Sequence, residues 1–124
     1  MELKRVVVTG IGAITPLGNN IGETLKGLVD GVSGAAPITH FDATKFKTTF
    51  ACEVKNFDPV KYFGKEARKM DPFTQFAAVA VEEAIKDSKL DLDAIDKNEV
   101  GVIWGAGIGG IQTFFEEVKN YVGG

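Results

Sequence analysis

The sequence contains a single cysteine and a single histidine among its 124 residues. One cysteine cannot form an internal disulfide, and one cysteine with one histidine does not supply the ligands of a usual structural zinc site. No apolar run approaches the roughly 18 residues that span a bilayer, and the start MELKRVVVTG lacks a signal-peptide core with a small-residue cleavage site. We therefore expect a cytoplasmic protein without a disulfide, a structural metal or a membrane-spanning helix.

An excess of positive charge is also missing, since the formal net charge is −3. This argues against a protein that binds nucleic acid over its whole surface. The charge is uneven, because residues 55–69 hold five basic and two acidic side chains, net +3, which leaves −6 for the rest of the chain. In a continuous helix one face would carry Lys61, Lys65, Arg68 and Lys69. Such a face would attract an acidic partner, although a merely solvated charged surface would have the same spacing.

The spacing of apolar residues, turns and caps predicts an α/β protein. Residues 5–9 and 100–104 are short apolar runs that each lead into a glycine, which is typical of strands buried in a parallel sheet. Capping residues and apolar periodicity predict helices over 21–29, 72–88 and 111–122, the last packing back on the sheet. A short edge strand within 48–54 and a helical turn over 58–62 complete the pattern. Two main strands are too few for a parallel sheet, so we expect residues 1–124 to be an incomplete domain of a longer chain.

Three motifs could carry chemistry, and each has a structural alternative. The run Gly105-Ala106-Gly107-Ile108-Gly109-Gly110 fits the G-x-G-x-x-G pattern of a dinucleotide site, but it follows a late strand and lacks the acidic residue expected about 20 positions later. Turns and close packing explain its glycines better. Cys52 stands next to Glu53, which would raise rather than lower a thiol pKa, and is expected to be a small strand residue. His40 is expected to be a loop histidine with a local partner.

Several longer motifs resemble one enzyme family. They are Val6-Val7-Val8-Thr9-Gly10-Ile11-Gly12, Thr15-Pro16-Leu17-Gly18-Asn19, Gly31-Val32-Ser33-Gly34, His40-Phe41-Asp42, Arg68-Lys69-Met70-Asp71-Pro72-Phe73 and the run from Gly105 to Gly110. In this order they resemble the start of the β-ketoacyl-acyl-carrier-protein synthases of type II, and they cover nearly the whole chain.

The resemblance implies a thiolase-like α/β fold, with five αβαβα layers in the complete protein, and a homodimer that needs no cofactor. It implies fatty acid elongation by decarboxylating Claisen condensation of malonyl-acyl-carrier protein with an acyl group held on a cysteine, with two histidines assisting. None of these catalytic residues matches a position in the 124 residues, so the piece alone is expected to be inactive and poorly folded. The alternatives are a thiolase-like partner subunit without the nucleophile, or a dinucleotide-binding α/β half.

Four residues carry over by position. Lys65, Arg68 and Lys69 match the residues of the family that dock the acidic acyl carrier protein with its phosphopantetheine-linked acyl and malonyl groups. Ile108 matches the branched residue that gates the acyl pocket. The resemblance therefore predicts a docking segment and a gate, but no catalytic residue, in this part of the protein.

Overall fold

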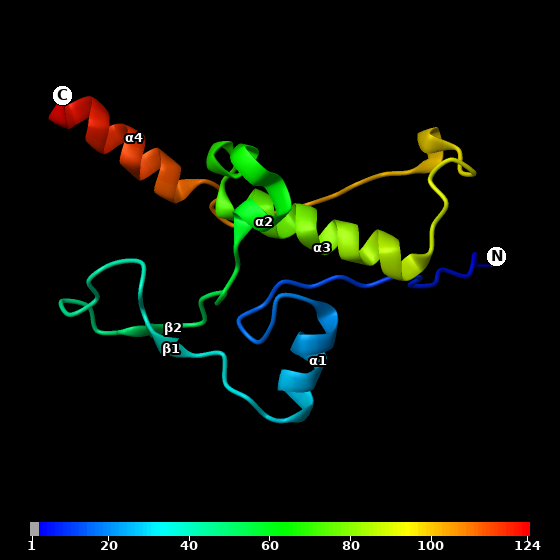
Figure 1. Ribbon diagram of the computed structural model, residues 1–124, viewed down its shortest axis with the longest axis horizontal. Helices are drawn as coiled ribbons and strands as arrows, with labels where there is room; N and C mark the ends of the chain where they lie inside the picture. Colours follow the sequence, from blue (N-terminus) through cyan, green and yellow to red (C-terminus); the bar gives the residue numbers. More distant parts are fainter. Residues whose placement is uncertain (1–2) are drawn as a thin grey trace. The chain divides into compact units, whose positions relative to one another are not determined.

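Residues 3–124 are described by a computed structural model, in which one long helix, α3 (Pro72–Ser88), is shared by two compact units (Figure 1). The first unit comprises residues 3–57 with Val79–Lys89, and the second comprises Asp58–Ala78 with Leu90–Gly124. The helix has the bounds that Asp71-Pro72 and its apolar stripe predict. In the described part of the chain, no helix has the length and apolar character needed to cross a membrane.

In the first unit, the chain start (blue in Figure 1) runs along the C-terminal half of α3. Two carboxylates of α3 hold it there: Asp87 accepts from the amide of Ile11 at 2.9 Å, and Glu83 accepts from the amide of Ala13 at 2.9 Å. The approach is so close that a Cβ at Gly12 would collide with the carbonyl oxygen of Ala80. Glycine is therefore required at position 12 by the packing of backbone on backbone.

Helix α1 (Ile21–Val29) has the predicted caps. Asn20 Oδ1 accepts from the amide of Glu23 at 2.8 Å, and Gly31 adopts φ +65° just after the helix, where glycine is favoured. A second carboxylate oxygen of Glu83 accepts from the amide of Ile21 at 2.9 Å. One side chain of α3 thus fixes both the N-terminal loop and the first turn of α1.

The sheet of the described residues is small and antiparallel. Strand β1 (Ala36–Pro37) pairs with β2 (Phe50–Ala51), with Ala36 opposite Ala51 and Pro37 opposite Phe50. The edge strand predicted within 48–54 is confirmed as β2, and its partner β1 had not been predicted.

The two strands predicted over 5–9 and 100–104 are wrong for this chain. Neither segment forms a strand or pairs with one among residues 3–124. Their apolar side chains are exposed to solvent, Val6 by 91% and Ile103 by 98%. An apolar run indicates that a segment tends to be buried, whereas a strand also needs a neighbour to which its amides and carbonyls can bond. The described residues supply no such neighbour.

The second unit contains α2 (Pro59–Phe63), the 3₁₀ helix η1 (Gly64–Lys69), the start of α3, the 3₁₀ helix η2 (Lys97–Glu99) and α4 (Ile111–Gly123). Asp58 caps α2 by accepting from the amide of Val60 at 3.0 Å, which confirms the predicted helical turn. Helix α4 also forms as predicted, but all of its residues are exposed, so the expectation that it packs on a sheet is wrong within residues 3–124.

Candidate functional site

The predicted basic face is divided between two short helices. Helix α2 ends at Phe63, and Gly64, which begins η1, adopts φ +55°. An α-helix cannot continue through a left-handed residue, so the prediction that Lys61 shares one continuous helical face with the later basic residues is wrong. With about three residues per turn in a 3₁₀ helix, Lys65 and Arg68 do share a face of η1.

The three predicted docking residues all lie on η1 with exposed side chains. Lys65, Arg68 and Lys69 are exposed, and Lys69 forms an ion pair of 3.0 Å with Glu66 on the same helix. Within residues 3–124, Lys65 and Arg68 have no carboxylate within salt-bridge distance. We call residues 64–69 the docking segment below, after the role predicted for it.

The docking segment is anchored to α3 by a side chain that sequence reasoning missed. Gln75 is buried, with 7% of its surface exposed, and its Nε2 donates to the carbonyl oxygens of Ala67 at 2.9 Å and Met70 at 3.0 Å. Ala67 is the buried residue of η1, 5% exposed. Gln75 therefore satisfies two carbonyls at the end of η1 and fixes the segment against the first turns of α3.

The glycine-rich run lies just before α4 in the same unit. Its end is close to α3, because a Cβ on Gly109 would lie 4.0 Å from a ring carbon of Phe73 and one on Gly110 would lie 2.5 Å from Asp71 Oδ2. Ile108, the predicted gate, is 74% exposed. The two glycines that follow the predicted gate thus lie near the start of α3, and the role of Ile108 in an acyl pocket stays a prediction.

A carboxylate lies beside the start of α4, at the end of the glycine-rich run. Asp71 accepts a hydrogen bond from Thr113 Oγ1 in the first turn of α4 and lies against Gly110, the N-cap residue. A helix N-terminus attracts anionic groups, and the Asp71 carboxylate already lies near this one. A pyrophosphate at this loop would meet the negative charge of Asp71, which argues against the dinucleotide alternative.

The two other candidate residues lie in the first unit, on exposed loop backbone. Cys52 follows β2 and is an exposed thiol, while the His40 Nε2 lies 3.9 Å from Glu53 Oε1. The Glu53 carboxylate accepts from the Thr39 hydroxyl at 2.6 Å and from its amide at 3.1 Å, and these bonds hold the Glu53 pKa below its ordinary value. His40 is thus a loop histidine with a local partner, as expected.

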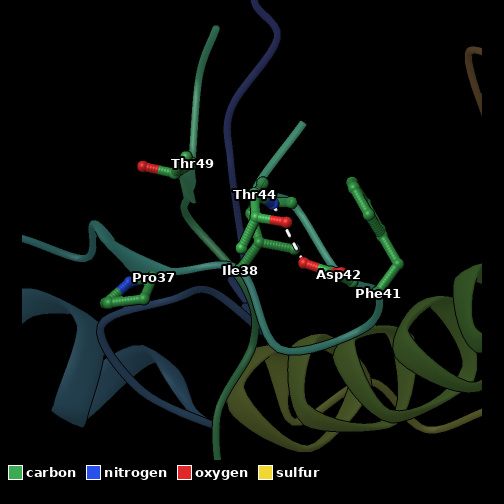
Figure 2. Close-up of a pocket in the computed structure, with 7 residues that line it drawn as sticks. Pro37, Ile38, Phe41, Asp42, Thr44 and Thr49 are labelled. Carbon is green, nitrogen blue, oxygen red and sulfur yellow. Dashed lines mark hydrogen bonds between the residues drawn. The ribbon is translucent and has the colours of Figure 1, made fainter. Parts of the chain in front are cut away.

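A hollow of about 280 Å³ opens beside this loop (Figure 2). Asp42 accepts from the amide of Thr44 at 3.0 Å at its edge, and this bond, with one from the Thr44 hydroxyl, lowers the Asp42 pKa. Neither Cys52 nor His40 lines the hollow. Among residues 3–124, no group of three or more His, Cys, Asp or Glu residues could hold a metal ion. The residues that line the hollow are Pro37, Ile38, Phe41, Asp42, Ala43, Thr44 and Thr49.

The sequence matches a known family and several curated proteins. Residues 3–122 match the family described as "Beta-ketoacyl synthase, N-terminal domain". A 3-oxoacyl-[acyl-carrier-protein] synthase 2 of Synechocystis sp. is 45% identical over 118 residues, which is 94% of this chain and 28% of that protein. The protein of the same name in Coxiella burnetii is 45% identical over 122 residues, 98% of this chain and 29% of that protein. The chain thus spans less than a third of the length of these relatives.

Two solved structures resemble the chain in three dimensions. One is titled the ishigamide ketosynthase/chain length factor, with a TM-score of 0.77 and 30% identity. The other is a type II polyketide synthase acyl-carrier protein in complex with its ketosynthase bound to the hexaketide, with a TM-score of 0.68 and 34% identity. Each match covers 94% of this chain and 30% of the other. They confirm the expected thiolase-like α/β fold, of which this chain forms a part.

Proposed function

Because the chain belongs to the β-ketoacyl synthase family, whose N-terminal domain matches residues 3–122, we propose that the protein elongates fatty acyl chains in type II fatty acid synthesis. The proposed reaction is the decarboxylating Claisen condensation of malonyl-acyl-carrier protein with an acyl group bound to the enzyme. Relatives named 3-oxoacyl-[acyl-carrier-protein] synthase 2 at 45% identity support this choice within the family.

The reaction balances without a redox cofactor. An acyl group moves from the carrier protein to a cysteine thiolate, which breaks the carrier's thioester bond and releases its phosphopantetheine thiol, and malonyl-acyl-carrier protein then loses its free carboxylate as CO₂. The remaining carbanion forms a carbon–carbon bond with the acyl carbonyl as the carbon–sulfur bond to the cysteine breaks, which releases a 3-oxoacyl product and restores the thiolate. We assign no part of this chemistry to Cys52 or His40, since both lie on exposed loop backbone away from the docking segment in sequence.

The observation that carries the proposal for this chain is the docking segment. Lys65 and Arg68 lie on one face of a short helix, are exposed and have no carboxylate within salt-bridge distance among the described residues, so their charge is available to a partner. A partner that carries acidic surface residues, as acyl carrier protein does by the resemblance, would be steered onto them by electrostatic attraction. We propose that Lys65, Arg68 and Lys69 bind acyl carrier protein.

Three further features belong to the same proposal. Ile108 would gate the acyl pocket, and the glycines that flank it leave its side chain room to change rotamer. The complete protein would act as a homodimer in the cytoplasm. These assignments follow from the resemblance.

A kinetic comparison of two substrate types tests the proposal. The complete gene product is supplied with malonyl-acyl-carrier protein and with an acyl group carried either on carrier protein or on a small thiol. We expect 3-oxoacyl product from both and a lower KM for the carrier-bound acyl group. Absence of condensation by a folded protein would overturn the proposal.

The second candidate function is a thiolase-like partner subunit that lacks the nucleophile. It follows from the same family match, because residues 3–122 carry none of the catalytic residues that the resemblance implies. Labelling the complete protein with an acyl donor and locating the acylated residue by mass spectrometry separates the two. Acylation of a cysteine beyond residue 124 supports the enzyme, and absence of any acylated cysteine supports the partner subunit.

A further inference from the structure

Two segments that are 42 residues apart in the sequence meet at the side chain of Asp71. Its Oδ1 accepts a hydrogen bond from the hydroxyl of Thr113 in the first turn of α4. A Cβ on Gly110 would lie 2.5 Å from the other carboxylate oxygen, Asp71 Oδ2. Because glycine has no Cβ, the carboxylate can lie against the backbone at the end of the glycine-rich run. Both contacts lie within the second unit.

The backbone of Asp71 is itself fixed. Its carbonyl oxygen accepts from the amide of Thr74 at 3.0 Å and from that of Gln75 at 3.1 Å, in the first turn of α3. Gln75 in turn holds the docking segment through Ala67 and Met70. Asp71 therefore stands at a hydrogen-bonded helix start, two residues after the docking segment, and its side chain reaches the start of α4.

The glycine-rich run has few other restraints. A Cβ on Gly105 or Gly107 would meet nothing within 4 Å, and Ile108 is 74% exposed. The contacts of Gly109 and Gly110 with α3 lie one and two residues after Ile108. A change at the contact between Asp71 and Gly110 would therefore act two residues from Ile108, in a loop with few other contacts.

We propose that Asp71 and Thr113 form a pin that positions the loop carrying Ile108 on the start of α3, next to the docking segment. Asp71 and Thr113 are positioning residues, and neither is assigned contact with substrate. The consequence for the reaction rests on the proposed function: the pin sets the resting position of the gate and so influences which acyl chains the enzyme accepts. The pin itself is a property of the chain that can be measured without any substrate.

Matched variants of the complete protein test the pin. Thr113→Val removes the hydroxyl at nearly constant shape, whereas Thr113→Ser keeps it. Gly110→Ala places a methyl group against the Asp71 carboxylate at a residue whose φ of −81° accommodates alanine. Gly123→Ala, where a Cβ meets nothing within 4 Å, is the control for adding a methyl group elsewhere on α4. The readouts are amide hydrogen exchange of residues 105–113 and the ratio of kcat/KM for a long-chain to a short-chain acyl substrate.

We expect Thr113→Val and Gly110→Ala to speed exchange of residues 105–113 by at least about threefold and to change the long-to-short ratio by a similar factor. Thr113→Ser and Gly123→Ala should match the wild type in both readouts. A general loss of stability would not change chain-length preference, so the ratio distinguishes positioning from a merely structural effect. Wild-type exchange in both test variants, or faster exchange with an unchanged ratio, would overturn the inference. If the wild-type protein condenses no acyl substrate, the proposed function is wrong, and exchange alone decides whether the pin holds the loop.

Discussion

Gln75, near the start of α3, donates a hydrogen bond of 2.9 Å to the carbonyl oxygen of Ala67 in η1, and both residues are buried. A second bond of 3.0 Å from the same Nε2 reaches the carbonyl oxygen of Met70. The side chain that orders the docking segment is thus uncharged and hidden beneath it. Its contribution can be separated from that of the charges themselves.

The first prediction concerns this anchor. Gln75→Leu fills the same space but leaves the carbonyls of Ala67 and Met70 without their donor, so we expect the free energy of unfolding to fall by about 1–3 kcal/mol. The KM for carrier-protein substrates should rise, because the segment is no longer held. Denaturant unfolding and steady-state kinetics of the complete protein provide the two measurements. The control is Gln112→Leu, since Gln112 is exposed and its side chain bonds to Glu116 on its own helix. Equal stability of the two variants would contradict the role of Gln75.

The second prediction concerns the charges. In Lys65→Glu/Arg68→Glu, repulsion replaces attraction, and we expect the KM for carrier-protein substrates to rise by about tenfold or more, with little change for small thioesters. The difference between variant and wild type should shrink as salt is added. Lys119→Glu, an exposed charge reversal on α4, is the control. The docking proposal fails if both substrate types are affected equally.

The third prediction concerns the ion pair of the docking segment. Lys69 pairs with Glu66 at 3.0 Å, and both side chains are largely exposed. Glu66→Gln removes a negative charge from the segment and releases Lys69, so we expect a KM for carrier protein that is lower by about two- to threefold, in keeping with the small energies of exposed pairs. Glu82→Gln releases Lys86 in the same way on α3 and should change nothing. A higher KM for Glu66→Gln would show that Glu66 helps docking instead.

The fourth prediction concerns pH. Hydrogen bonds from Thr39 lower the Glu53 pKa in the folded protein, and the charge of His40 adds to this. The stability that Glu53 contributes is therefore present above its ordinary value of 4.5 and is lost as pH falls through the lower folded-state pKa. Thr39→Val removes the hydroxyl donor and should raise the Glu53 pKa toward 4.5, as followed by NMR titration of its carboxyl carbon. Thr49→Val serves as the control, and an unchanged Glu53 pKa in Thr39→Val would refute the assignment of cause.

Features with a local signal in the sequence could be predicted. The bounds of α3 follow from Asp71-Pro72 and the apolar stripe, and α1 follows from Asn20 and Gly31. The order of motifs also identified the family and the fold. In each case the information lies within a few neighbouring residues or in a long ordered match.

Features that depend on distant partners could not be predicted. The segments 5–9 and 100–104 have the apolar pattern of strands, but pairing is decided by neighbours that the pattern does not contain. Gln75 and Glu83 resemble ordinary polar helix residues in the sequence, and their roles follow only from which carbonyls and amides the fold brings to them. The break at Gly64 was readable in principle, because a glycine stood inside the proposed basic face.

The most direct test of the central claim follows one carbon atom. The complete protein is given an acyl-acyl-carrier protein and malonyl-acyl-carrier protein labelled with ¹³C at its free carboxylate, and the products are read by mass spectrometry. We expect an unlabelled 3-oxoacyl-acyl-carrier protein, longer than the acyl substrate by the two carbons left from malonyl, with all of the label released as CO₂. Retention of the label in the product, or no lengthened product from a folded and acyl-charged protein, would contradict the proposal that this is a decarboxylating condensing enzyme.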